Sequence, residues 1–131
     1  MAACNPSQLL CNVTNTFTRY DGPPIAEAHT YWQMLGTLRW LCITRVDITF
    51  ACNTHCRYMK NPGPDHFAGV KSILRYITGT LDEGLVFTYG NGVVALEAYA
   101  VADFAGEATT MRSIAAHIIR INPTSSPFSW K

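Results

Sequence analysis

Apolar residues recur at helical spacing in three successive stretches between residues 31 and 85. Side chains three or four positions apart share one face of a helix, so each stretch predicts an amphipathic helix. The apolar positions are Tyr31, Met34, Leu35, Leu38 and Leu41 in the first stretch, Ile48, Ala51, Cys52, His55 and Met59 in the second, and Phe67, Val70, Leu74 and Ile77 in the third.

Short polar and helix-breaking motifs separate the three predicted helices. Thr44-Arg45-Val46-Asp47 matches a capping box, in which Thr44 accepts a hydrogen bond from a free backbone N–H and Asp47 reaches back to the N-cap. Pro64 suits the first turn of the third helix, and Gly79 suits the C′ position that follows a helix. The sequence therefore predicts helix boundaries near these residues.

The periodicity changes after the third helix. Leu85–Tyr89 is rich in β-branched and aromatic residues, which predicts a strand, and Gly90-Asn91-Gly92 is typical of a hairpin turn after it. Val93–Val101 alternates as a strand does, and Ile114–Ile121 and Pro127–Trp130 predict two further strands. The expected fold class is α+β, in which a three-helix block is followed by a small and mainly antiparallel sheet.

The N-terminal part of the chain carries little periodicity. Proline, glycine and asparagine punctuate residues 1–28, which predicts an irregular or extended arm. The expected organisation is therefore an arm over residues 1–28, a helical block over residues 29–83 and a β-sheet over residues 84–131.

Composition is that of a globular protein. Of the 131 residues, 48% are hydrophobic and 15% are charged, which argues against disorder throughout. The net charge of +1 gives no strong attraction to nucleic acid or acidic lipid. No apolar run approaches the roughly 18 residues of a membrane span, and the N-terminus lacks a signal-peptide pattern. We therefore expect an intracellular protein, cytoplasmic or nuclear.

The chain contains five cysteines, which are Cys4, Cys11, Cys42, Cys52 and Cys56. Their odd number argues against a secreted disulfide framework, and we expect reduced thiols packed as small hydrophobic side chains. Cys52 and Cys56 share one helical face beside His55, but a structural zinc site needs four ligands and no second matched pair follows. We therefore expect no bound metal and no cofactor.

Many residues of the helical block form one ordered series of motif positions. They are Tyr31, Leu35, Gly36, Leu38, Trp40, Leu41, Thr44, Arg45, Asp47, Ile48, Phe50, Ala51 and Asn53, then Arg57, Met59, Asn61 and Pro62, then residues 73–77, 79–82 and 84–85. This order resembles the segment after the polymerase palm in copia-type retrotransposon Pol polyproteins. The resemblance implies the C-terminal part of a reverse transcriptase and a thumb-like or connecting role beside a template–primer duplex.

The resemblance continues into the start of a ribonuclease H domain. There the family has G-Y-S-D-A-D-W-A-G-D, followed by R-S-T-S-G-Y and I-S-W-S-S-K-K, and this chain has related letters at residues 98–107, 112–117 and 127–131. The resemblance makes the first Asp of that motif a Mg²⁺ ligand, and Val101, which stands there, has no oxygen donor. Asp103 retains the second Asp, on the same face of the strand, as a weak remnant of the catalytic set. We therefore expect an incomplete ribonuclease H-like fold with no intact catalytic or metal site.

The helical block carries six of the ten basic residues of the chain. Lys71 and Arg75 are the preferred nucleic-acid contacts because i, i+4 spacing puts them on one helix face, and Arg57 and Lys60 are further candidates. The alternative is that all four are ordinary solvated positions. The expected partner is an RNA–DNA hybrid or the rest of a Pol polyprotein, with no membrane and no small-molecule ligand.

Three hypotheses about function follow. The leading one is a truncated fragment of a reverse transcriptase/ribonuclease H polyprotein from a transposable element, without catalytic activity of its own, since the polymerase motif Tyr-x-Asp-Asp is absent as well. The second is a small nucleic-acid- or protein-binding module derived from such a polyprotein. The third is a residual Mg²⁺-dependent ribonuclease acting on RNA–DNA hybrids.

Overall fold

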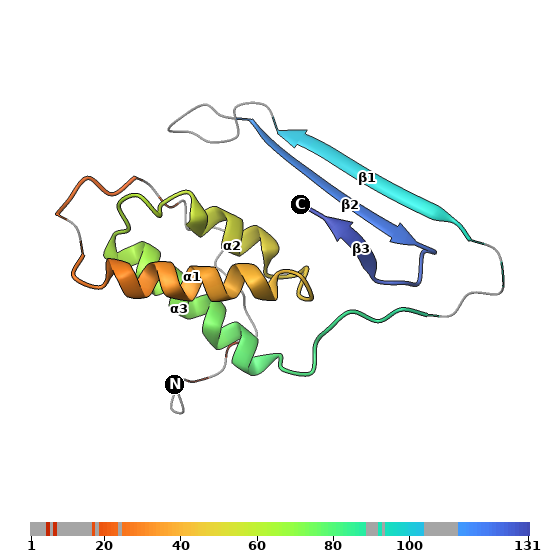
Figure 1. The fold of residues 1–131 in the computed structure, drawn as a ribbon, viewed down its shortest axis with the longest axis horizontal. Coiled ribbons are helices and arrows are strands. Elements are labelled where there is room, and N and C mark those ends of the chain that lie inside the picture. The colour runs from red at the N-terminus through yellow and green to blue at the C-terminus, as the bar shows by residue number, and fades with distance from the viewer. Residues whose placement is uncertain are drawn as a thin grey trace. The chain divides into compact units, whose positions relative to one another are not determined.

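The computed structural model describes residues 5, 7, 17, 19–23, 25–88, 92, 94–103 and 113–131. The chain divides into two compact units, Met1–Glu83 and Gly84–Lys131. Among the described residues, the first unit contains three helices and the second contains three strands, so the predicted α+β class is confirmed (Figure 1). In the part of the chain that the structure describes, no helix has the length and apolar character needed to cross a membrane.

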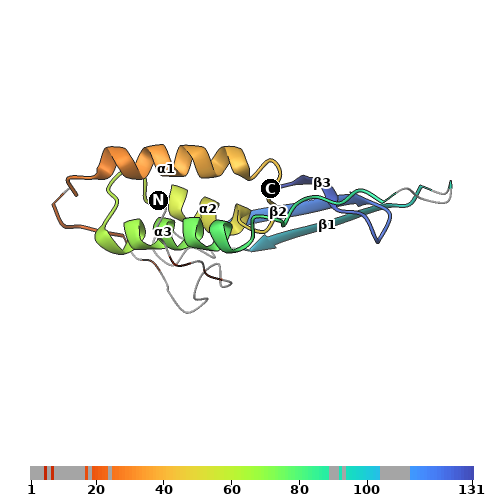
Figure 2. The ribbon, with the colours of Figure 1, turned by 90° about the horizontal axis from the view of Figure 1, so that it is seen from below.

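The helices of the first unit are α1 (Ala28–Leu41), α2 (Thr49–Cys56) and α3 (Pro64–Gly79). α2 runs opposite to α1 and α3, and the two longer helices lie on opposite sides of the unit in the turned view (Figures 1 and 2). Each helix turns its predicted apolar stripe inward. The buried hydrophobic residues are Tyr31, Leu35, Leu38, Ile48, Ala51, Cys52, Phe67, Val70 and Ile73.

The predicted stripes need small corrections at their ends. Ile73 takes a fully buried place in the third stripe, while Leu74 and Ile77 pack against the core only in part. Met59 lies beyond the end of α2 and is 39% exposed. In α1, Met34 and Leu41 are likewise only partly buried, whereas Tyr31, Leu35 and Leu38 are buried as predicted. Burying each large aliphatic side chain stabilises the fold by about 1.5–3 kcal/mol.

The capping box predicted at Thr44–Asp47 is wrong. The Thr44 hydroxyl donates to the Leu41 carbonyl at 3.3 Å, and α2 begins at Thr49 with Ile48 as its N-cap. The reason is that another partner takes the Asp47 carboxylate. Arg45 donates to it from Nε at 3.0 Å and from Nη2 at 2.7 Å.

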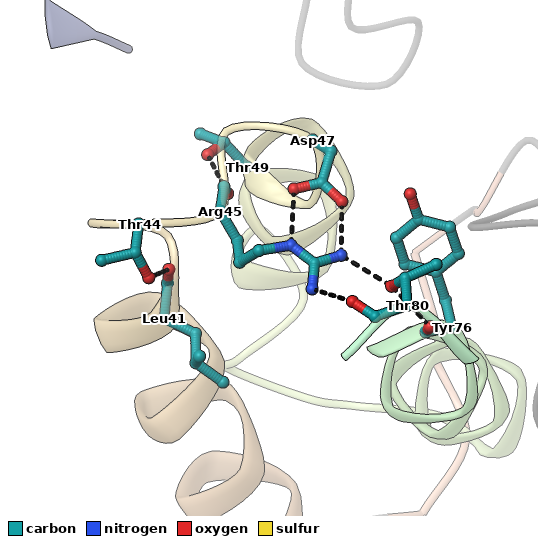
Figure 3. A network of polar contacts seen from close by, with 7 residues as sticks. All are labelled: Leu41, Thr44, Arg45, Asp47, Thr49, Tyr76 and Thr80. Carbon is teal, nitrogen blue, oxygen red and sulfur yellow. Dashed lines mark hydrogen bonds and ion pairs between the residues drawn. The ribbon is translucent and has the colours of Figure 1, made fainter. Parts of the chain in front are cut away.

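Arg45 links the connection between α1 and α2 to the end of α3 (Figure 3). Its Nη1 donates to the Thr80 carbonyl at 2.8 Å, and its Nη2 donates to the Thr80 hydroxyl at 2.7 Å. That hydroxyl donates in turn to the Tyr76 carbonyl at 2.9 Å. The guanidinium therefore satisfies the Thr80 carbonyl directly and orients the Thr80 hydroxyl, which satisfies the Tyr76 carbonyl, at a helix end where carbonyls lack intrahelical partners.

The arginine at the centre of this network is largely withdrawn from water, whereas Asp47 is partly exposed. Arg45 is only 6% exposed, and its guanidinium lies 5.7 Å from the centre of the Tyr76 ring. Burial alone would raise the pKa of the Asp47 carboxyl, but the hydrogen bonds and charge of Arg45, with help from Tyr76, outweigh burial and lower that pKa. Asp47 therefore stays ionised beside Arg45 at neutral pH.

The two ends of α3 are built differently from each other. Pro64 occupies the first turn as predicted, and the Gly63 N–H donates to His66 Nδ1 at 2.9 Å. The prediction of Gly79 as C′ is wrong, because Gly79 is the last helical residue and Thr80, at φ −134°, caps the helix. A left-handed residue is not needed there, since Arg45 already binds the Thr80 carbonyl.

The second unit is an antiparallel sheet in the order β1 (Leu96–Asp103), β2 (Ile114–Ile121) and β3 (Pro127–Trp130). The predicted bounds of β2 and β3 are confirmed, whereas β1 starts and ends later than the predicted strand. Asn122, at φ 63°, extends the β1–β2 ladder by one step, since it donates to the Ala95 carbonyl at 2.7 Å and its Oδ1 accepts from the Ala95 N–H at 3.0 Å.

The strand predicted over residues 85–89 is wrong where the structure describes it. Residues 85–88 form no strand. Val86 instead exchanges hydrogen bonds with Ser126, donating to its hydroxyl at 2.8 Å and accepting from its N–H at 2.9 Å. The rest of the predicted strand and most of the hairpin turn, residues 89–91, lie outside the described residues, as does Val93, where the following strand was predicted to start.

Replacing Asp47 with Asn should destabilise the first unit by about 1–3 kcal/mol. The change leaves the buried Arg45 guanidinium without its counter-charge, although the partial exposure of Asp47 reduces the cost below that of a fully buried pair. Urea unfolding measures it. Asp82→Asn, at an exposed carboxylate, should shift stability by less than about 0.5 kcal/mol. Equal effects of the two variants would contradict the role of the pair.

Two glycines inside helices should respond to alanine with opposite signs. A Cβ at Gly36 would meet nothing within 4 Å, so Gly36→Ala should stabilise the unit by about 0.5–1 kcal/mol through helix propensity. A Cβ at Gly69 would collide with the buried His55 ring, so Gly69→Ala should destabilise by about 1–3 kcal/mol despite the same gain in propensity. Thermal unfolding of both variants measures the difference, and stabilisation by Gly69→Ala would contradict the packing.

Candidate nucleic-acid interface

Val101 and Asp103, the two positions of the expected catalytic pair, lie on one face of β1. In the antiparallel register, Val101 stands opposite Ala116 and Asp103 stands opposite Ile114, so both side chains point to the same side of the sheet. Both residues are exposed. The structure therefore puts Asp103 on the same side of the sheet as Val101, among aliphatic neighbours.

The other described carboxylate of this face, Glu97, is occupied. It stands opposite Arg120 in the register and accepts from Arg120 Nε and Nη2, each at 2.7 Å. The Tyr99 hydroxyl also donates to it, at 3.3 Å. Glu97 thus serves a cross-strand ion pair. Glu107, the remaining acid of this stretch, lies outside the described residues. Over the described residues, no three His, Cys, Asp or Glu side chains gather in a group that could hold a metal ion.

Lys71 and Arg75 share one exposed face of α3, as their spacing predicts. The Lys71 ammonium lies over the Phe67 ring, 4.3 Å from its centre, in a cation–π contact on an exposed side chain. The opposite face of the helix is anchored by Val70 and Ile73, both essentially fully buried. This anchoring fixes the direction in which the two cations point.

Arg57 and Lys60 lie on a different element. Both are exposed in the turn that follows α2, before α3 begins. The structure therefore presents the four predicted basic contacts as two pairs, one on a rigid helix and one on a turn, and not as a single row.

The group around Cys52, His55 and Cys56 belongs to the core. Cys52 and His55 are buried, and Cys42, Cys52 and Cys56 are free thiols, in agreement with the prediction for these three; Cys4 and Cys11 lie outside the described residues. Burial raises the pKa of the Cys52 and Cys56 thiols. Burial together with nearby His66 lowers the pKa of His55 to about 4, so its ring is neutral at physiological pH.

Two polar residues that the pattern did not single out for function have defined partners. Tyr58 and Asn61 bind backbone carbonyls of the N-terminal arm, at Phe17 and at Tyr20 and Gly22. Gly69, inside α3, is a sequence signal that the arm packs on the helical unit, since Phe17 of the arm is one of the residues that lie close to it. Glycine inside a helix is unfavourable unless another group approaches closely. Periodicity cannot name that group.

Comparison with known proteins gives relatives over most of the chain. It is 34% identical over 113 residues to the retrovirus-related Pol polyprotein from transposon RE2 of Arabidopsis thaliana, which covers 86% of this chain and 8% of that protein. It is 33% identical over 111 residues to the corresponding polyprotein from transposon RE1, covering 85% of this chain and 7% of that protein. An uncharacterized mitochondrial protein of the same plant is 32% identical over 108 residues, covering 82% of this chain and 42% of that protein.

No protein-family model and no solved structure matches the chain. The chain spans less than a tenth of the length of the two Pol polyproteins. The ordered motif residues of the helical block and the identity over most of the chain lead to the same assignment. This protein belongs to the copia-type retrotransposon Pol polyproteins.

Proposed function

We propose that this segment of a Pol polyprotein contacts nucleic acid through its helical unit and carries no catalytic activity of its own. The observation that carries the proposal is the exposed cation pair Lys71 and Arg75 on α3, a helix whose other face is fixed in the core. Phosphate contacts of this kind position a protein on a duplex without reading its sequence.

The spacing of the two cations suits a phosphate backbone. Four residues of α-helix advance about 6 Å, which is close to two steps of about 3.4 Å each along the duplex axis. A helix laid along the backbone can therefore place both charges near phosphates of the same strand. The expected affinity is modest and strongly dependent on salt, because few phosphates are neutralised.

The charge pattern of the described structure also supports this surface. The ion pairs of the described residues join Arg19 with Asp21, Arg45 with Asp47 and Arg120 with Glu97. Lys71 and Arg75 are outside these pairs and exposed, so their charge acts outward. The net charge of +1 is a sum over the whole chain and does not describe this face.

The absence of catalysis is proposed from the chemistry of the sheet. Two-metal hydrolysis needs several carboxylates around the ions, and on the described face of β1 Glu97 is bound by Arg120 while Val101 replaces an acid. Asp103 remains as one exposed carboxylate. A single carboxylate is a poor ligand set for Mg²⁺, which keeps most of its water in such sites.

Binding of an RNA–DNA hybrid should weaken as salt rises, and replacing both Lys71 and Arg75 with Ala should reduce the magnitude of the slope of log K against log salt by about 2, about one for each phosphate contact. Filter binding from low to physiological salt measures this slope. Arg19→Ala, at an arginine already paired with Asp21, should leave it unchanged. Salt-independent binding, or an unchanged slope in the double variant, would sink the proposal.

The competing function, a residual ribonuclease, predicts cleavage of the RNA strand in Mg²⁺. We expect none from the wild-type chain and none from Val101→Asp, because two carboxylates about 7 Å apart along one strand still lack the rest of a two-metal set. Val101 is 66% exposed, so the substitution should not disturb folding. A labelled hybrid incubated with Mg²⁺ or with EDTA gives the answer, and Mg²⁺-dependent cleavage by either protein would refute the proposed lack of activity.

A further inference from the structure

Residues 17 and 19–22 of the N-terminal arm, here called the strap, lie across the first helical unit. The Phe17 ring packs edge-on against the buried His55 ring, with centroids 4.6 Å apart, and lies 5.8 Å from the His66 ring. The Tyr58 ring stacks on His66 at 4.1 Å, and the Tyr58 hydroxyl donates to the Phe17 carbonyl at 2.6 Å. An aromatic anchor and a backbone hydrogen bond therefore hold one end of the strap.

Asn61 holds the other end. Its side-chain amide donates to the Tyr20 carbonyl at 2.9 Å and to the Gly22 carbonyl at 3.3 Å. One amide thus binds two carbonyls that are two residues apart. These contacts hold backbone carbonyls at the bend of Gly22 and do not depend on particular side chains.

The helical unit is shaped to receive the strap. A Cβ at Gly63 would lie 2.7 Å from Tyr20 Cγ, and a Cβ at Gly69 would lie 3.1 Å from Phe17 Cζ besides colliding with His55. Glycine is unfavourable inside a helix, so Gly69 within α3 is accounted for by the rings that approach it. Two helix-unit glycines therefore make room for the strap and for the ring beneath it.

The charged residues of the strap take no part in this contact. Arg19 and Asp21 pair with each other at 3.1 Å, and their side chains are 78% and 80% exposed. The strap therefore exposes its ion pair to water, whereas its carbonyls and the Phe17 ring contact the helices. This division is typical of a segment docked by backbone and one apolar anchor.

We propose that Tyr58, Asn61 and the surface around Gly63 and Gly69 form a receptor for the strap, and that this joint can open while the helices stay folded. An earlier part of the arm contacts α3 outside this receptor, since the Ser7 N–H donates to the Arg75 carbonyl at 3.1 Å. The joint holds the arm to the unit through contacts of its own in addition to the chain connection. It does not rest on nucleic-acid binding, since none of its residues belongs to the four basic contacts.

Trypsin cleavage after Arg19 in the full chain tests the joint. The Tyr20 carbonyl and ring are held when the strap is docked, so the cleavage rate follows the fraction of molecules with the strap released. Tyr58→Phe removes one hydrogen bond and keeps the ring, and should raise the rate about fivefold. Asn61→Ala removes two hydrogen bonds and should raise it about tenfold or more.

Asn53→Ala is the matched control. Asn53 is also a helical-unit asparagine with a hydrogen-bonded side chain, but its partner is Arg39, at 2.6 Å, and not the strap. Cleavage after Lys71 and Arg75, both inside α3, reports unfolding of the whole unit in the same digests. A rise confined to Arg19 in the Tyr58 and Asn61 variants, with Asn53→Ala within twofold of wild type, supports the joint. Unchanged cleavage, or an equal rise at all three sites, overturns it.

Discussion

The helical unit depends on one buried guanidinium. Arg45 follows α1 in the chain, yet its hydrogen bonds reach Asp47 before α2 and Thr80 at the end of α3. One side chain thereby fixes the connection between two helices and closes the carboxyl end of the third. Because the group is almost fully withdrawn from water, each of its donors needs a partner, which leaves the surrounding backbone few alternative arrangements.

The two units differ in how far they bury their own apolar surface. The helices close a core in which Tyr31, Leu35 and Val70 have no exposed surface. The strands do not, since Leu96, Tyr99 and Val101 on β1 are each more than half exposed. A sheet with an open edge and apolar side chains in water is expected to gain stability from further contacts.

The proposed role follows from the same contrast. The helical unit carries the exposed cations Lys71 and Arg75. On the sheet, the family resemblance implies metal ligands at Val101 and Asp103, and of these two positions only Asp103 has a carboxylate. Electrostatic contact needs only fixed positive charge near phosphates, whereas hydrolysis needs a complete ligand set. The proposed strap joint gives the helical unit a second role beside nucleic-acid contact. Tyr58 and Asn61 bind the arm, while Lys71 and Arg75 are exposed to water.

The sequence by itself determined the three helices, the strands β2 and β3, the apolar stripes and the family, because helix and strand periods are local properties of neighbouring residues. Through the family resemblance it also predicts that Val101 stands at the position of an acid. Only the tertiary structure decided that Asp47 binds Arg45 and does not cap α2, that Thr80 and not Gly79 ends α3, and that Asn61 binds the arm. Those outcomes depend on groups far apart in the chain, which a local capping or turn rule does not include. The same reason explains the wrong strand prediction at residues 85–89. Val86 hydrogen-bonds to Ser126, forty residues away, and this contact, not local β-propensity, determines the backbone conformation there.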